Sequence, residues 1–119
     1  MKLELNTFRN RRVVYGIDVT EDINLNVLAE KGLISKHSLN REDIILNDIN
    51  NWLQNNGINL LEFVDSCEDP DDIHLHLIAI CPNNKLDTEM ISQYDQQFRE
   101  TIDLIDGNRF GATIYPILT

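Results

Sequence analysis

Apolar residues alternate or cluster along the chain in a pattern that predicts strands near its start. Residues 12–19, with the sequence RVVYGIDV, are rich in β-branched and aromatic types and are interrupted by Gly16 and Asp18. Such a composition predicts a largely buried strand. Leu3 and Leu5 alternate with polar residues before it, so a short additional strand is expected there.

Three further strands are predicted, and two of them form a hairpin. Residues 60–66 and 72–81 are mostly apolar, and in the second run apolar residues occupy alternate positions. The acidic stretch 68–72 between them contains a proline and supplies the turn. Residues 109–118 are also strand-like, and Pro116 suits an edge strand because an edge tolerates a missing backbone donor.

Two amphipathic helices flank this hairpin in the sequence. The first follows Asn40, a candidate N-cap, and ends at Gly57. Its apolar residues recur at helical spacing and are Ile45, Ile49, Trp52 and Leu53. The second follows the candidate cap Asp87 and carries an apolar stripe made of Ile91, Tyr94, Phe98, Ile102 and Ile105.

A shorter helical segment is expected directly after the first long strand. Thr20 is a candidate cap, acidic residues follow it in the first turn, and Gly32 supplies a stop, which predicts a helix to about Glu30. A linker over residues 33–39 then leads to the next helix. Together these residues, 21–39, form a helical insertion that is longer than a usual connection.

The predicted order of elements is β-α-β-β-α-β, which is typical of a ferredoxin-like, or split-βαβ, sheet with its helices on one face. In that arrangement the first and third strands are central. They are also the two most apolar strands, so composition and topology agree. A chain of 119 residues encloses one core, and we expect a single α+β domain over residues 1–119.

The net charge of the chain limits the kinds of molecule that it is expected to bind. Twenty acidic residues against ten basic ones give a net charge of −10, which disfavours direct binding to nucleic acid or to an anionic membrane. No apolar run has the length of a signal peptide or a membrane span, so a cytoplasmic location is expected. Cys67 and Cys81 are the two cysteines, too few for a disulfide-stapled secreted domain.

The densest polar feature is a group of six acids within eleven residues, with no base among them. They are Glu62, Asp65, Glu68, Asp69, Asp71 and Asp72. Their spacing does not match the ligand pattern of an EF-hand loop. Two interpretations stay open: a solvated hairpin tip that discourages edge-to-edge pairing, and a docking surface that steers a cationic protein. Glu21, Asp22 and Glu30 in the insertion form a second candidate patch.

His74 and His76 form an H-x-H pair, which in a strand places both imidazoles on one face about 7 Å apart. If Cys67 lies opposite His74 and Asp65 opposite His76, four potential zinc ligands share that face. A change of one residue in register moves Cys67 and Asp65 to the other face.

The hydrophobic pattern favours this second register. In it Leu61 and Phe63 join the apolar residues of the neighbouring strand on the helix-covered face. The residues beside the histidines are then Glu62, Val64 and Ser66. No metal site is therefore predicted.

The sequence carries no recognised catalytic or cofactor motif. A G-x-S-x-G element, a glycine-rich phosphate loop and a C-x-x-C pair are all missing, so no cofactor is predicted and an enzyme is not favoured.

The leading hypothesis is a small acidic protein-binding module, an inhibitor or immunity-type protein that neutralises a basic partner such as a nuclease toxin. The alternative is a homodimeric small-ligand domain or small enzyme whose open sheet face forms a pocket with Tyr15, His74 and His76.

Overall fold

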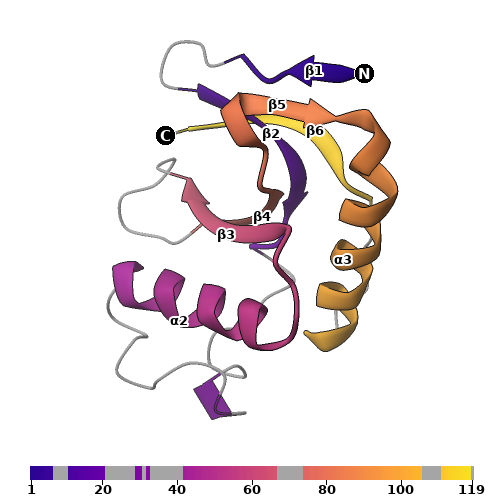
Figure 1. The fold of residues 1–119 in the computed structure, drawn as a ribbon. Coiled ribbons are helices and arrows are strands. Elements are labelled where there is room, and N and C mark those ends of the chain that lie inside the picture. Colours follow the sequence, from indigo (N-terminus) through magenta and orange to yellow (C-terminus); the bar gives the residue numbers. More distant parts are fainter. Residues whose placement is uncertain are drawn as a thin grey trace.

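The computed structural model describes residues 1–6, 11–20, 29–30, 32, 42–66, 74–105 and 111–118. These residues form an α+β fold with two α-helices and two antiparallel sheets (Figure 1). The elements are β1 (Lys2–Glu4), β2 (Arg11–Asp18), α2 (Glu42–Asn55), β3 (Leu61–Ser66), β4 (His74–Ala79), β5 (Lys85–Asp87), α3 (Ile91–Leu104) and β6 (Thr113–Leu118). Short 3₁₀ turns at Pro82–Asn84 and Thr88–Met90 flank β5.

The larger sheet has four strands in the order β3-β4-β2-β6, and every neighbouring pair is antiparallel. The two central strands are β2 and β4, as their apolar composition predicts. They are also the most buried, with Val14 at 2% and Leu77 and Ile78 at 0% exposure. Pro116 lies in β6 at one edge of the sheet, which confirms its expected position.

The β3–β4 hairpin adopts the register that the hydrophobic pattern favours. Phe63 pairs with Leu77, and Ser66 pairs with His74. Leu61 and Phe63 are consequently buried in the core that the helices cover, whereas Ser66 lies beside the histidines on the opposite face. The register that would assemble zinc ligands is not formed, because Asp65 pairs with Leu75.

The second sheet is a pair of short strands, β1 and β5, of which only β1 was expected. Leu3 pairs with Leu86, and Leu86 is fully buried. Asn83 and Asn84 adopt positive φ angles of 58° and 54°, a conformation that Asn tolerates better than most residues. The turn they form lets the Asn84 carbonyl accept a hydrogen bond of 2.7 Å from the Leu5 amide.

Both helices pack into one core with one face of the larger sheet (Figure 1). Ile49 and Leu53 of α2 and Tyr94 and Phe98 of α3 are at most 2% exposed, which confirms the described part of both predicted stripes. The Ile45 side chain lies outside the described residues. Asp87 caps the 3₁₀ turn before α3 through a 3.0 Å bond from the Glu89 amide.

The insertion is described only in part. Ala29 and Glu30 are helical, which agrees with the expected short helix. Residues 21–28, 31 and 33–39, which include the expected linker, lie outside the described residues. Among the described helices, none is both long and apolar enough to cross a membrane.

The face of the sheet away from the helices carries a smaller apolar cluster. Val14, Ile78 and Ile117 are its buried members, and Tyr115 packs against them. Alternation along the strands also places His74, His76 and Asp18 on this face.

Candidate functional site

Two members of the predicted acidic group are described, and both have partners within the sheet. Glu62 lies 3.9 Å from Arg12, with the two side chains 37% and 34% exposed. A surface ion pair of this kind contributes about 0–1 kcal/mol. Asp65 accepts a 2.9 Å hydrogen bond from the His74 amide, which ties the end of β3 to the start of β4.

The other acids of this group, Glu68, Asp69, Asp71 and Asp72, lie outside the described residues. So do Glu21 and Asp22 of the second candidate patch, whose remaining member Glu30 is exposed. Whether either predicted patch forms a unit therefore depends on residues outside the described ranges.

The described residues on either side of residues 67–73 are Ser66 and His74. Both lie at the same end of the larger sheet as Asp18. We call this the hairpin end and define it by Asp18, Asp65, Ser66 and His74. In sequence, the four remaining acids of the group are joined to the sheet here through Ser66 and His74.

The described cations gather at the opposite end. Arg11 and Arg12 begin β2. Arg12 lies near Cys81, just beyond the end of β4, and its positive charge partly offsets the rise that burial causes in the pKa of the Cys81 thiol. Lys85 begins β5, and Lys2 lies in β1 beside it. Of the described Lys and Arg residues only Arg99, on α3, lies away from this group.

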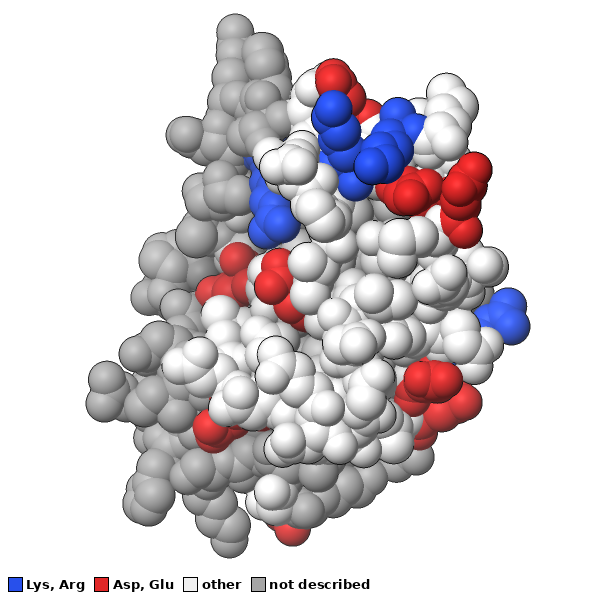
Figure 2. Space-filling view, in the orientation of Figure 1, with Lys and Arg blue, Asp and Glu red and all other residues white. Residues whose placement is uncertain are grey.

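Figure 2 shows the resulting distribution of charge. Most blue atoms lie near the top of this face, where red atoms lie beside them, and further red atoms are spread over the rest. Carboxylates accompany these cations, since Lys2 lies opposite Asp87, Lys85 opposite Glu4 and Arg12 beside Glu62. The hairpin end differs because it carries no Lys or Arg among the described residues, which favours the approach of a cationic partner there.

The face away from the helices was expected to be open, but Val14, Ile78 and Ile117 are at most 3% exposed there. His76 forms the best-defined polar contact on this face. Its Nδ1 lies 2.7 Å from the Tyr115 hydroxyl, and its side chain is 4% exposed. Burial, followed by the Asp18 carboxylate, raises the pKa of Tyr115 above its usual range. The phenol therefore stays protonated at neutral pH and can donate to an unprotonated Nδ1.

Tyr115 was missed as a partner of His76. Its strand was predicted, but β6 and β4 are separated by β2, and no local pattern links residues across a third strand.

Tyr15 does not join the histidines, contrary to the pocket expected on the open face. It lies on the helix-covered face, where its hydroxyl donates a 2.6 Å bond to Asp95 of α3. Its ring packs edge-on against Phe98 at 5.8 Å. The physical reason is parity: Ile17 pairs with Leu77, which places odd-numbered residues of β2 opposite the face that His76 occupies.

Ser66 contributes a second buried polar group to the face away from the helices. It is 1% exposed, and its hydroxyl makes no hydrogen bond within the described part of the chain. Leaving a buried hydroxyl without a partner costs about 1–3 kcal/mol.

Thiol chemistry has little support in the described residues. Cys81 is half-buried and free, and burial raises the pKa of its thiol, against smaller opposing effects of the Tyr94 hydroxyl and Arg12. A raised pKa keeps the thiol protonated and weakly nucleophilic. Cys67, the partner considered for His74, lies outside the described residues.

Neither a metal site nor a similarity to known proteins identifies a function for the chain. Within the described ranges, no three His, Cys, Asp or Glu side chains are grouped so that they could hold a metal ion. No family model, curated protein or solved structure matches the chain.

Proposed function

We propose that this chain is a small acidic protein-binding module, an inhibitor or immunity-type protein of the cytoplasm that covers the anion-binding surface of a basic partner. A nuclease toxin domain is one such partner, because its own ligand is a polyanion. The net charge of −10 and the grouping of described cations away from the hairpin end carry the proposal.

The hairpin end is the proposed contact surface. Asp18 and Asp65 lie there, and the sequence between Ser66 and His74 adds Glu68, Asp69, Asp71 and Asp72. Carboxylates of this kind accelerate association with a cationic partner and exclude anionic competitors. The energy of a stable complex additionally requires apolar or aromatic anchors, which the partner contributes in part.

We infer further that the larger sheet is ferredoxin-like. The order β3-β4-β2-β6, the antiparallel neighbours and the position of both helices in one core support this assignment. Many functions occur on such sheets, so the assignment does not itself select the partner.

The open-face alternative has weaker support. Tyr15 belongs to the other face, and His76 is already bonded to Tyr115.

The test compares two triple variants that lose the same charge. One carries Asp69→Asn, Asp71→Asn and Asp72→Asn. The control carries Glu4→Gln, Glu89→Gln and Asp103→Asn, three exposed positions away from the hairpin end. Each tagged protein is used for affinity capture from its source cells, and captured proteins are quantified by mass spectrometry.

We expect a basic protein to be captured in stoichiometric amount by the wild type and the control, and several-fold less by the hairpin variant. Capture should also weaken as salt is raised, because the screening length falls from about 10 Å at 0.1 M to about 3 Å at 1 M. Equal capture by both variants, or a partner that is not basic, contradicts the proposal.

A further inference from the structure

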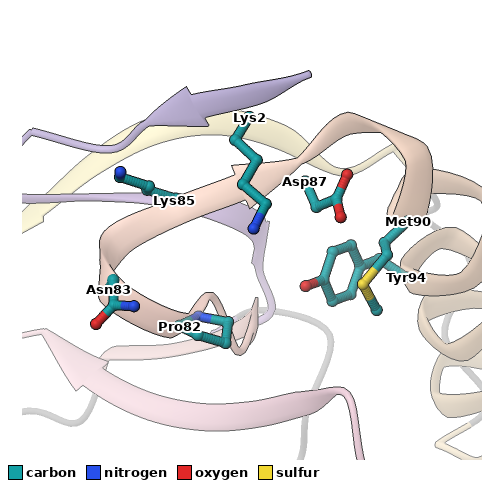
Figure 3. A pocket seen from close by; sticks show the side chains of 7 residues that line it. All are labelled: Lys2, Pro82, Asn83, Lys85, Asp87, Met90 and Tyr94. Atoms are coloured by element: carbon teal, nitrogen blue, oxygen red, sulfur yellow. The ribbon is translucent and has the colours of Figure 1, made fainter.

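A cavity of about 250 Å³ lies between the smaller sheet and the start of α3 (Figure 3). None of its lining residues belongs to the hairpin end, and the proposed function does not use it. Its lining residues are Lys2, Pro82, Asn83, Lys85, Asp87, Met90 and Tyr94. At about 30 Å³ for each water-sized group, it holds roughly eight such groups, which suits a small ligand.

The inner wall of this cavity is apolar and rigid. Tyr94 is 2% exposed, and its hydroxyl donates a 3.2 Å bond to the Ile80 carbonyl, which fixes the ring. Figure 3 shows the Met90 side chain beside this ring and the Pro82 ring at the other side of the cavity. An aromatic or aliphatic group gains free energy by leaving water for such a wall.

One ammonium group is directed into the cavity. Figure 3 shows the Lys2 side chain crossing it towards Tyr94, whereas Lys85 points away. Burial is the largest cause that raises the pKa of Tyr94, so its phenol stays neutral and does not repel an anion. Lys2 therefore supplies a cation above an apolar wall.

Asp87, the cross-strand neighbour of Lys2, limits the charge of a ligand. Asp87 lines the cavity, and its carboxylate is held in place by the Glu89 amide at 3.0 Å. A second negative charge on the ligand is repelled by this carboxylate. Because Asp87 offsets the Lys2 charge at longer range, the site favours at most one ligand carboxylate, placed directly on the Lys2 ammonium.

We propose that this cavity binds a small monocarboxylate with an apolar body, its carboxylate on the Lys2 ammonium and its apolar group against Tyr94 and Met90. Asn83 and Asn84, both at positive φ, shape the turn at the cavity's rim. The residues that make the site come from β1, the 3₁₀ turn at Pro82–Asn84, β5, the following 3₁₀ turn and α3. The site thus depends on the pairing of β1 with β5.

Phenylacetate is a suitable probe, with phenylacetamide and phenethylamine as neutral and cationic analogues and inorganic phosphate as a purely polar anion. Binding to the full chain is followed by ¹H–¹⁵N NMR titration. We expect saturable shifts of amides in residues 82–90 with phenylacetate, with a dissociation constant on the order of 1 mM for so small a ligand. The other probes should bind at least about tenfold more weakly, because each loses either the ionic or the apolar contact.

Two charge-matched variants locate the site. Lys2→Gln should weaken phenylacetate binding about tenfold, whereas Arg11→Gln, an exposed cation that does not line the cavity, should change it less than about twofold. A dispersed NMR spectrum shows that each variant is folded. Equal weakening by both variants, equal binding of phenylacetamide, tighter binding of phosphate, or no saturable shift overturns the proposal.

Discussion

The Tyr115 hydroxyl lies 2.7 Å from Nδ1 of His76, although the two residues belong to strands that β2 separates. Tyr115 pairs with Val14 of β2, whereas His76 pairs with Asp18. The residue of β2 midway between these positions on the same face is Gly16. Tyr115 therefore reaches His76 across the one position of that face of β2 that has no side chain.

Gly16→Ala should destabilise the protein strongly. A Cβ atom at this position would meet the Leu77 carbonyl oxygen and would lie 2.9 Å from Cγ2 of Ile78. Backbone atoms of a central strand cannot move away cheaply, so we expect the free energy of unfolding in urea to fall by about 1–3 kcal/mol or more. Thr113→Ala, at the exposed position opposite Gly16, is the control and should change it by less than about 0.5 kcal/mol. A tolerated alanine at residue 16 would show that the strands do not approach so closely.

The contact between Tyr115 and His76 should appear as a coupling energy. Tyr115→Phe removes only the hydroxyl, and His76→Asn removes the imidazole. Their combined effect on the free energy of unfolding should be smaller than the sum of the single effects, by about 0.5–1.5 kcal/mol, which is the usual net contribution of one hydrogen bond. Urea unfolding of the four proteins of the cycle measures this difference. Strict additivity would mean that the bond does not stabilise the folded state.

Local patterns in the sequence predicted most helices and strands. They predicted fewer of the contacts between residues on different strands. The β3–β4 register followed from alternation, because a shift by one residue would expose Phe63. The face that Tyr15 occupies depends instead on how β2 registers against β4, which is set by contacts far apart in sequence. The same holds for the Tyr115 partner of His76. Strand β5 was missed because Leu86 is its single apolar residue and no apolar residue alternates with it, unlike Leu3 and Leu5 around β1.

Asn50 of α2 protects the outer edge of β3, and replacing it should weaken that edge. Its Oδ1 accepts a 2.7 Å bond from the Phe63 amide, and its Nδ2 donates a 3.1 Å bond to the Phe63 carbonyl. Asn50→Ala breaks both bonds and leaves a partly buried backbone pair without partners, so we expect a loss of about 1–3 kcal/mol. Asn51→Ala, at the exposed next position of the same helix, should cost less than about 0.5 kcal/mol. Faster amide hydrogen exchange at Phe63 in Asn50→Ala alone would identify the β3 edge as the affected region. Equal losses of stability in the two variants would contradict the role of Asn50 at this edge.

Alkaline pH should destabilise the fold through its buried tyrosines. Burial, then the hydrogen bond that Tyr15 donates to Asp95 and the charge of that carboxylate, raises the pKa of Tyr15, and burial raises the pKa of Tyr115. In the unfolded chain tyrosine titrates near pH 10, so above that pH the unfolded state loses these protons first and binds fewer than the folded state. The free energy of unfolding must then fall as pH rises, by up to about 1.4 kcal/mol per pH unit for each tyrosine.

Urea unfolding of the wild type and of Tyr15→Phe at several pH values above about 9 measures this slope. We expect a shallower slope in Tyr15→Phe, because the phenylalanine has no proton to lose, and a still shallower one when Tyr115→Phe is added. Thr113→Ala keeps both phenols and should retain the wild-type slope. Lysines titrate in the same range, near pH 10.4, but they are common to all four proteins and cancel in the comparison. An unchanged slope in the double variant would mean that neither phenol is held in its neutral form by the fold.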